Sequence, residues 1–359
     1  MNKVYIIAEA GVNHNGDIEL AKNLIDIAYS AGADAVKFQI FKAENLATPK
    51  AKKAKYQLNT TNKKESQLKM LQSLELKNEE YLLLKKYAKK LGIDFLVSAF
   101  DQESLKFILD DLKVKKLKIP SGEITNGPFI LEHAKSGLDI ILSTGMSDLN
   151  EIKRALSVIA FGYLYPSELK KPNKKNFELA YESIEGKNLI KKKVTILHCT
   201  TEYPAPIIDL NLKAIDSMRN YFDTKIGYSD HSKTILASLV SASLNIDVIE
   251  KHFTIDQKLD GPDQKASLSP TELKTMISSI RQIEKMMGDG KKKASKSELK
   301  NIVIARKSMV ASKDIKKGQV LSKKNITFKR AGEGKSPMDF WDILNTKANK
   351  NFKKNEIIN

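Results

Sequence analysis

Short apolar runs of strand length alternate with longer stretches of helical periodicity along most of the chain, and this alternation repeats eight times. The expected strands cover residues 4–10, 35–40, 95–100, 117–120, 140–144, 194–199, 225–228 and 248–253. A helical pattern follows each strand, and the last begins with Ser269, Pro270 and Glu272, which supply an N-cap, a first-turn proline and a capping-box acid. Eight strand–helix units predict a (β/α)8 barrel, the TIM barrel. The rival fold, an open doubly wound sheet, usually has fewer strands and often a Gly-rich dinucleotide turn, which is absent from the sequence.

The sequence divides into two expected domains. Residues 1–288 carry the barrel pattern, and two long connections interrupt it at 42–68 and 162–192. Connections of this length are either functional lids or disordered. A charged linker is expected at 289–300. Beyond it, short strand candidates separated by turns predict a small, mainly β domain over 301–359, near the size at which a core is marginal alone.

Polar side chains gather at the expected carboxyl ends of the strands, which share one rim in a barrel. They are Glu9, Lys37, Gln39, Lys118, Ser121, Glu123, Ser143, Ser229, His231, Glu250 and His252. Four of the five histidines also lie at or just beyond strand ends, namely His14, His198, His231 and His252. Any one of these residues alone is more often a hydrogen-bonded structural group than a catalyst. Their convergence on one rim, and the cost of burying Lys37 or Lys118 without an anionic partner, indicate a functional site.

The residue types at this rim suit a small anionic substrate. The two lysines supply charge, and hydroxyls supply directional donors for a phosphate and a carboxylate; these are Ser121, Ser143 and Ser229. His231 and His252, on adjacent expected strands, could share one divalent metal, with water, a carboxylate or substrate oxygens at the remaining positions. Acids and bases, or groups that bind sugar hydroxyls, are available in Glu9, Glu123, Glu250 and Asp263. The residues by themselves therefore predict a metal-assisted reaction without naming the substrate.

The net charge of +18 invites a nucleic-acid interpretation, but the composition argues against it. Of the 61 basic residues only five are arginine, the residue that base and phosphate recognition favours, and no aromatic platforms accompany the lysine runs. No apolar run is long enough for a membrane span, and the single cysteine, Cys199, excludes an internal disulfide framework. Because the N-terminus leads directly into a strand pattern without a signal-type apolar stretch, a cytoplasmic location is expected.

Eight motifs along almost the whole chain resemble the sialic acid synthase family. They are "IIAEAGVNHNGD", "AGADAVKFQ", "KIPSGEITN", "ILSTGM", "HCTTEYPAP", "GYSDH", "VIEKHFT" and "GPDQKASL". The tail "ARKSMVASKDIKKGQVLS" and the following "ITFKRAGEG" resemble the antifreeze-like (SAF) domain at the C-terminus of the family. The resemblance implies an enzyme that condenses phosphoenolpyruvate and water with an N-acetylmannosamine-type sugar, giving a nine-carbon 2-keto acid and phosphate.

The resemblance also implies residue roles. His231 and His252 would hold a divalent metal, typically manganese with magnesium or cobalt as alternatives, that polarises the sugar aldehyde. Phosphoenolpyruvate would be held by Lys37, Lys118, Ser121, Ser143 and Ser229. Glu9 would act as an acid or base, which makes Glu9, Lys37, Lys118, His231 and His252 the implied catalytic set. The sugar and water contacts would be Gln39, Glu123, Tyr203, Glu250 and Asp263. Family members are domain-swapped homodimers, which would bring Arg330 from the SAF domain of one subunit to the N-acyl group in the barrel of the other.

The sequence departs from the family pattern at three motifs. "VSAF" replaces "STPF", with Ser98 and Ala99, so that a contact is expected to be missing there. Gln264 stands where histidine is usual, and Ala331 replaces the proline after Arg330. These differences leave the sugar open between the precursors of N-acetylneuraminate and of N,N'-diacetyllegionaminate. The rival interpretations of the chain are a pseudaminate synthase, a non-catalytic sugar- or phosphate-binding barrel, and an RNA-binding protein.

Overall fold

The computed structural model describes residues 3–62, 65–167 and 170–359. The chain forms two compact units, Met1–Asp289 and Gly290–Asn359, and each is described by itself. Within the described ranges, no helix has both the length and the apolar character that a membrane crossing requires.

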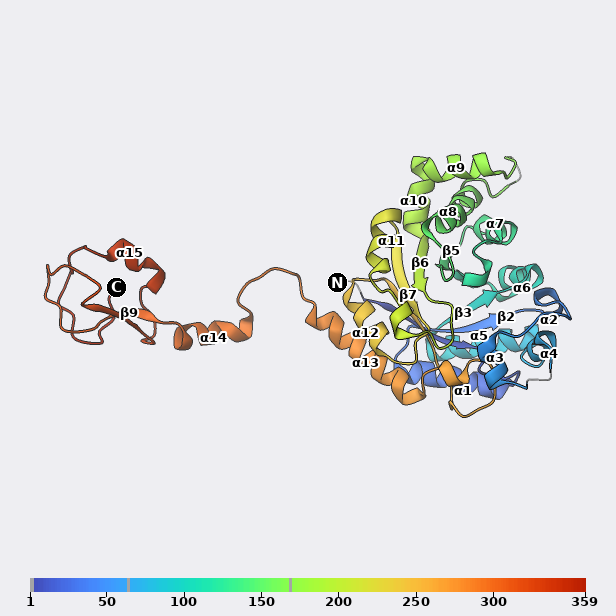
Figure 1. Cartoon of the computed structure of the whole chain (residues 1–359), viewed down its shortest axis with the longest axis horizontal. Coiled ribbons are helices and arrows are strands. Elements are labelled where there is room, and N and C mark those ends of the chain that lie inside the picture. The colour runs from blue at the N-terminus through green and yellow to red at the C-terminus, as the bar shows by residue number, and fades with distance from the viewer. Residues whose placement is uncertain (1–2, 63–64, 168–169) are drawn as a thin grey trace. The chain divides into compact units, whose positions relative to one another are not determined.

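The first unit is a closed barrel of eight parallel strands in sequential order, which confirms the predicted TIM barrel (Figure 1). The strands are β1 (Tyr5–Gly11), β2 (Ala35–Ile40), β3 (Asp94–Ala99), β4 (Lys116–Ile119), β5 (Asp139–Ser143), β6 (Val194–Cys199), β7 (Lys225–Asp230) and β8 (Val248–His252). Strand β7 runs two residues further than the pattern predicts, and this places Ser229 and Asp230 opposite Glu250 and Lys251 of β8. Register between these two strands therefore decides which side chains enter the barrel mouth.

Helices surround the barrel. Those of the first unit are α1 (Ile18–Ala31), α2 (Ala43–Leu46), α3 (Lys55–Thr60), α4 (Gln67–Gln72), α5 (Asn78–Leu91), α6 (Gln102–Phe107), α7 (Gly127–Lys135), α8 (Leu149–Leu164), α9 (Lys174–Glu182), α10 (Ile184–Lys193), α11 (Ala214–Phe222), α12 (Leu236–Ser243) and α13 (Pro270–Met286). Helix α13 starts as predicted: the Ser269 side chain accepts from the Glu272 amide, and Pro270 occupies the first turn.

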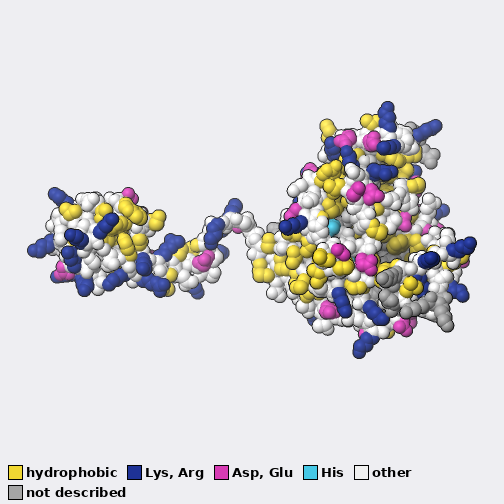
Figure 2. All heavy atoms as spheres, viewed as in Figure 1, with side chains coloured by type: hydrophobic (Ala, Val, Ile, Leu, Met, Phe, Trp, Pro, Cys, Tyr) yellow, Lys and Arg dark blue, Asp and Glu magenta, His cyan; other side chains and the backbone are white. Residues whose placement is uncertain are grey.

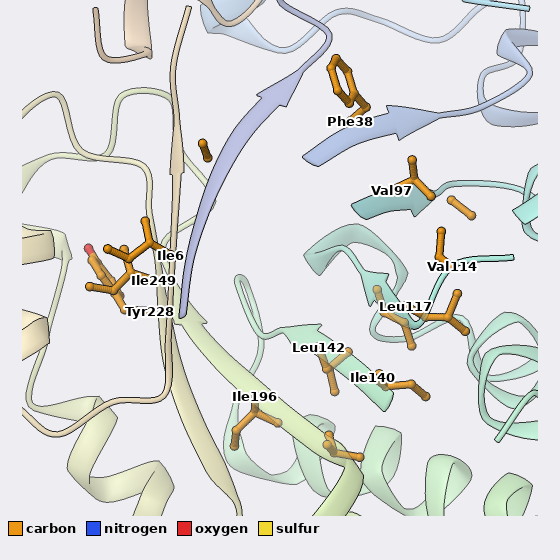
Figure 3. Packing of buried hydrophobic residues seen from close by; sticks show 14 of the residues in the cluster. Ile6, Phe38, Val97, Val114, Leu117, Ile140, Leu142, Ile196, Tyr228 and Ile249 are labelled. Atoms are coloured by element: carbon orange, nitrogen blue, oxygen red, sulfur yellow. The ribbon is translucent and has the colours of Figure 1, made fainter. Parts of the chain in front are cut away.

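Two layers of apolar side chains hold this unit together. The larger layer lies between the outer face of the strands and the helices, where Ile6, Phe38 and Ile249 are fully buried (Figure 3). A smaller layer fills the barrel interior and includes Ile7 and Leu197. Because the interior layer occupies the middle of the barrel, a cavity lined by polar side chains can form only at an end of the barrel, and TIM barrels use the carboxyl end.

The two long connections are largely helical rather than structureless. Helices α2 and α3 and the start of α4 lie in 42–68, and α2 and α4 contribute to a small apolar cluster apart from the main core. In 162–192, helices α9 and α10 pack against α8. Residues 63, 64, 168 and 169 of these connections lie outside the described residues. Each connection contains helices and buries apolar side chains, although most of its residues are polar.

The second unit contains helix α14 (Lys296–Ala305), the antiparallel pair β9 (Ser308–Ala311) and β10 (Ile326–Lys329), and the short helix α15 (Phe340–Ile343). Single bridges extend the β structure, and Met309, Leu321 and Phe352 are among the residues of its compact core. Helix α14 begins inside the segment 289–300 expected to be a linker, because Ser295 and Glu298 form a capping box there. The small, mainly β architecture predicted for the tail is confirmed.

Candidate active site

A cavity of about 380 Å³ opens at the carboxyl ends of the strands, where a TIM barrel carries its chemistry. Thirteen of the fourteen predicted site residues line it: Glu9, Lys37, Gln39, Lys118, Ser121, Glu123, Ser143, Tyr203, Ser229, His231, Glu250, His252 and Asp263. Arg330 follows β10 in the second unit. The strands and their loops thus bring together residues that lie far apart in the sequence, from Glu9 to Asp263.

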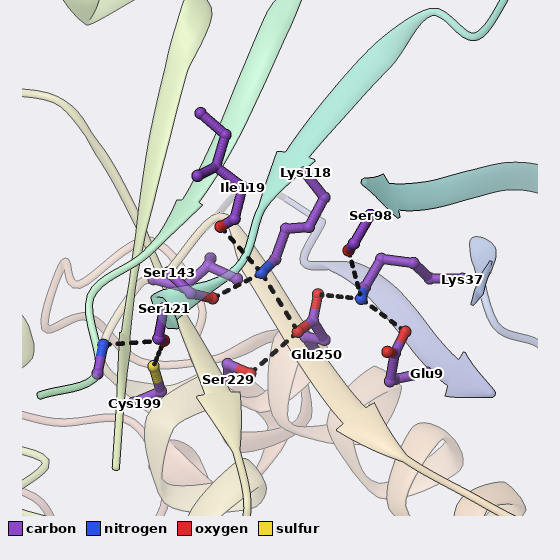
Figure 4. A network of polar contacts seen from close by, with 12 residues as sticks. Glu9, Lys37, Ser98, Lys118, Ile119, Ser121, Ser143, Cys199, Ser229 and Glu250 are labelled. Carbon is purple, nitrogen blue, oxygen red and sulfur yellow. Dashed lines mark hydrogen bonds and ion pairs between the residues drawn. The ribbon is translucent and has the colours of Figure 1, made fainter. Parts of the chain in front are cut away.

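A buried network of lysines and carboxylates forms one side of the cavity (Figure 4). The Nζ atom of Lys37 lies 2.6 Å from Oε2 of Glu9 and 3.6 Å from Oε2 of Glu250. It also donates to Oγ of Ser98 at 3.2 Å. Gln39 donates to the other oxygen of Glu9 at 3.1 Å, so that both carboxylate oxygens have a partner. Parallel pairing of β1 with β2, with Glu9 opposite Lys37, builds this part of the network directly into the sheet.

The second lysine shares one of these carboxylates. Lys118 donates to Oγ of Ser143 at 2.7 Å, and its Nζ lies 3.7 Å from Oε1 of Glu250. The hydroxyl of Ser229 donates to that same oxygen at 3.1 Å. Figure 4 shows Glu250 between the two lysines, as an internal counter-ion. Both ammonium groups are therefore already paired with carboxylates of the protein, and an anionic ligand would have to compete with Glu250 for both of them.

Burial and nearby charges shift the pKa values of the two carboxyl groups, Glu250 and Glu9, in opposite directions. Burial alone would raise the pKa of Glu250, but the ammonium groups of Lys118 and Lys37 outweigh it and bring that pKa to about 2. Burial raises the pKa of Glu9, and Lys37 only partly offsets this. Burial lowers the pKa of Lys118, against the attraction of Glu250. Glu250 is thus held ionised, while Glu9 takes up a proton more readily than an exposed glutamate.

Near Lys118, small polar groups pack closely at the turn after β5. The hydroxyl of Ser121 accepts from the amide of Gly145 at 3.0 Å and lies 3.2 Å from Sγ of Cys199. A Cβ atom on Gly145 would stand 2.0 Å from Oγ1 of Thr201, so that a larger residue there would force Thr201 to shift. The result is a close cluster of hydroxyl and amide groups of the kind that binds phosphate oxygens.

Two histidines face the network from β7 and β8. Nδ1 of His231 lies 2.7 Å from the carbonyl oxygen of Thr200, and because a carbonyl only accepts, Nδ1 carries the proton. Nε2 is then a lone-pair acceptor for the Tyr203 hydroxyl at 3.3 Å; the Ser229 oxygen lies 3.2 Å away, but its proton is directed to Glu250. The ring stacks on Tyr203 at a centroid distance of 4.3 Å. These contacts fix both the orientation and the tautomer of His231.

His252 completes the pair, with ring centroids 5.7 Å apart. Its Nδ1 atom is buried without a hydrogen-bond partner, and Oδ2 of Asp263 lies 3.9 Å away. Burial lowers the pKa of His231 to about 4 and that of His252 to about 3, so both imidazoles are neutral near pH 7. The His252–Asp263 approach is consequently not an ion pair. Burial, with the nearby charge of Glu9, raises the pKa of Asp263 to about 7.

This arrangement fits a divalent metal. Neutral imidazoles with free lone pairs are the form in which histidine binds metals, and His231 has the backbone-bonded second nitrogen typical of such ligands. The unpartnered nitrogen of His252 is consistent with a ligand outside the protein. In the described part of the chain, no group of three metal-type side chains comes together. Substrate oxygens or water would therefore have to supply the remaining positions.

Two of the four rim histidines do not enter the cavity. His198 lies on β6, and Nε2 of its ring bonds the carbonyl oxygen of Leu210 at 2.8 Å. His14 is fully buried within the loop after β1, where Nδ1 accepts from the Gly16 amide. Neither lines the cavity. Both lie at or just beyond a strand end, as expected, but strand alternation and loop direction turn their rings away from the cavity.

The structure adds residues that the motifs did not single out. Ser98, at a departure from the family pattern, contacts Lys37 and lines the cavity, so that the contact expected to be missing is filled. Tyr56 and Gln57, in the connection after β2, also line it, and Tyr56 packs on Tyr203 at 5.2 Å. Gln264 instead donates to Asn15 outside the cavity. For Tyr56 and Gln57, the only signal in the sequence was the unusual length of the connection after β2 that contains them.

A closed barrel with a lysine–carboxylate network and paired imidazoles at its carboxyl rim defines an enzyme of small anionic substrates. Residues 24–292 match the NeuB family, and residues 306–359 match the SAF domain. The chain belongs to the NeuB family.

Relatives with known names agree with this assignment. The chain is 51% identical to the N,N'-diacetyllegionaminic acid synthase of Campylobacter jejuni, over 100% of this chain and 99% of that protein. It is 40% identical to the synthase of the same name from Legionella pneumophila, over 97% and 91%. A solved N-acetylneuraminic acid synthetase of Leptospira borgpetersenii superposes with a TM-score of 0.66 at 34% identity, over 84% and 90%. The predicted sialic acid-type synthase with a C-terminal SAF domain is confirmed.

Proposed function

We propose that this synthase condenses phosphoenolpyruvate with 2,4-diacetamido-2,4,6-trideoxymannose and water, giving N,N'-diacetyllegionaminate and phosphate. The observation that carries the reaction is that two neutral histidines face the Lys37–Lys118–Glu250 network within one cavity. The choice of sugar is supported by similarity: identity is 51% and 40% to two diacetyllegionaminate synthases, but 33% to a pseudaminate synthase and 31% to a human N-acetylneuraminate-9-phosphate synthase.

Phosphoenolpyruvate is held by the lysine side of the cavity. Lys37 and Lys118 provide the charge for its phosphate and carboxylate, and directional donors come from the hydroxyls of Ser121, Ser143 and Ser229. In the free enzyme Glu9 and Glu250 balance the two ammonium groups. Binding of the anion consequently exchanges carboxylate contacts for phosphate contacts, and the hydroxyls remain available for both states.

The reaction forms one carbon–carbon bond and one carbon–oxygen bond, the latter from water, and breaks the carbon–oxygen bond to phosphate. The methylene carbon of phosphoenolpyruvate attacks the sugar aldehyde, whose oxygen becomes a hydroxyl and takes up a proton. Water adds at the adjoining carbon, and loss of phosphate by C–O cleavage leaves the 2-keto acid. Glu9 is placed between Lys37 and Gln39 to carry a proton near the reacting centre. Glu123, Tyr203, Glu250 and Asp263 contact the sugar or order water.

His231 and His252 would hold the divalent metal, and we propose manganese, with magnesium or cobalt as alternatives. When bound, such a metal polarises the aldehyde and adds the positive charge that an otherwise balanced lysine–carboxylate network lacks. The carbonyl of Thr200 and the ring of Tyr203 keep His231 in the tautomer that presents Nε2 to the cavity.

We also propose a domain-swapped homodimer that acts in the cytoplasm, with Arg330 of one subunit reaching the N-acyl group of the sugar in the other. Exposed apolar residues support the association. Figure 2 shows hydrophobic side chains gathered on the face of the barrel where α12 lies, and Leu236 and Val240 of that helix are 63% and 51% exposed. Static light scattering at several protein concentrations tests the dimer, and a monomer at all of them would refute it.

The test of the reaction is phosphate release from phosphoenolpyruvate by the chelator-treated full chain, with and without added manganese. Each of the two sugars, 2,4-diacetamido-2,4,6-trideoxymannose and N-acetylmannosamine, is supplied in turn. Manganese-dependent release that favours the first sugar is expected. Release only with N-acetylmannosamine would replace the product by N-acetylneuraminate, and no release by folded protein would favour a non-catalytic binding barrel.

A further inference from the structure

One side of the active-site cavity is hydrocarbon, and the proposed chemical steps do not use it. We call this surface the apolar wall; it consists of Phe41, Leu46, Met70, Leu71, Leu74 and Phe100. These six side chains pack in or against one small cluster that is separate from the barrel core. Phe41 and Phe100 meet edge to face at a centroid distance of 6.3 Å. The wall is thus a packed surface that opens into the cavity.

The apolar wall lies across the barrel mouth from His231. Its residues follow β2 and β3 directly or come from α2, α4 and the turn after α4. His231 directly follows β7, and in the closed eight-stranded order β3 stands opposite β7, whereas His252 on β8 lies nearer to β2. An open-chain sugar with its aldehyde carbon beside His231 therefore has room to extend its far end across the mouth toward the apolar wall.

We infer that the apolar wall is a subsite for the far end of the acceptor, and that it selects a 6-deoxy sugar with a second acylated amine. This inference rests on the proposed function. Such a sugar presents two methyl groups there, one at C6 and one on the acyl group at N4. N-Acetylmannosamine presents hydroxyls at C4 and C6 instead. Hydroxyls against hydrocarbon lose hydrogen bonds to water without replacement, whereas methyl groups gain contact.

A polar neighbour completes the subsite. Gln67, the first residue of α4, lines the same cavity next to the apolar wall. Its side-chain amide offers both a donor and an acceptor to the amide of the second acyl group. An apolar surface with a single placed polar group is the usual construction of a specific small-molecule site. The connection after β2 thereby acts as the element that distinguishes acceptors.

The test compares two half-buried leucines of the same cluster. Both leucines pack against the cluster, but Leu46 lines the cavity and Leu68 does not. Leu46→Gln places an amide on the apolar wall, and Leu68→Gln is the matched control. Phe100→Tyr, a smaller change at another half-buried wall residue, serves as a second variant if Leu46→Gln fails to fold, as judged by its melting temperature. The readout is kcat/KM for phosphate release with each of the two sugars.

Wild-type enzyme is expected to favour the diacetamido sugar by at least about tenfold in kcat/KM, as one apolar group in a pocket is worth roughly 10- to 200-fold. Leu46→Gln is expected to lower that preference about tenfold, through loss on the diacetamido sugar, while Leu68→Gln retains it. A wild-type preference that survives in both Leu46→Gln and Phe100→Tyr would overturn the subsite and leave the proposed function standing. A wild-type enzyme without that preference would overturn the proposed function itself.

Discussion

The ion pair between Lys251 and Asp230 offers the sharpest test of how this site is held in place. Both residues are at most 1% exposed, and their charged atoms lie 3.1 Å apart. Oδ1 of Asp230 accepts from the Ser232 amide and hydroxyl, and Oδ2 accepts from the Ser238 hydroxyl at 2.6 Å. The Lys251 ammonium also bonds the carbonyl oxygens of Ser232 and Thr234. Each residue directly precedes one of the two histidines, so the pair fixes the register that presents them.

The perturbation is Lys251→Met, which keeps the length of the side chain and removes its charge. At 3.1 Å and an effective dielectric constant of about 20, the attraction is about 5 kcal/mol. Burial opposes it, since it lowers the pKa of Lys251 against the attraction of Asp230. The net cost of leaving one buried charge unpaired is about 3–5 kcal/mol. We therefore expect the melting temperature of the barrel to fall by roughly 6–20 °C, at about 2–4 °C per kcal/mol for a domain of this size.

Denaturant unfolding followed by circular dichroism measures this loss. Asp230→Asn in the Lys251→Met background removes the orphan charge, and the double variant is expected to recover at least about half of the lost free energy of unfolding. Lys225→Met, at an exposed lysine of the same β7, is the control and should stay within about 0.5 kcal/mol of wild type. The reasoning is refuted if Lys251→Met unfolds within about 1 kcal/mol of wild type, or if the double variant is no more stable than the single one.

Three further changes address the metal ligands, the phosphate side and the fold. His231→Ala should abolish manganese-dependent phosphate release and weaken manganese binding in calorimetry with the melting temperature retained, whereas His198→Asn, outside the cavity, should bind manganese normally. Gly145→Ala should raise the KM for phosphoenolpyruvate about tenfold or more, because its Cβ would stand 2.0 Å from Oγ1 of Thr201; an unchanged KM would contradict that crowding. Burial lowers the pKa of His133 from 6.5 to about 4 in the folded state, so the unfolded state takes up the proton first and stability falls as pH drops below 6.5. His133→Gln should reduce the loss of unfolding free energy between pH 7 and pH 5 by about 2 kcal/mol, and equal losses in both proteins would disprove this contribution.

The sequence alone determined the barrel and most of the residues in its mouth. Strand alternation indicated eight units, and parallel strands in a barrel have their carboxyl ends at one rim. Lys37, Lys118 and Glu250, each at or near a strand end, could therefore be placed in one cavity from the order of the strands. The family motifs added Tyr203, which lies outside the strands.

Only the tertiary structure decided which way side chains turn and which partners they find. His198 and His231 look alike as histidines at neighbouring strand ends, yet one bonds the outer carbonyl of Leu210 and the other enters the cavity. The direction follows from strand register and loop path, which local sequence does not specify. The same holds for the counter-ion role of Glu250 and for the apolar wall, since both depend on contacts between segments far apart in the chain. Most residues of the connection after β2 are polar. Its few apolar residues form a continuous surface only because the fold brings them together with Phe41 and Phe100, which follow β2 and β3.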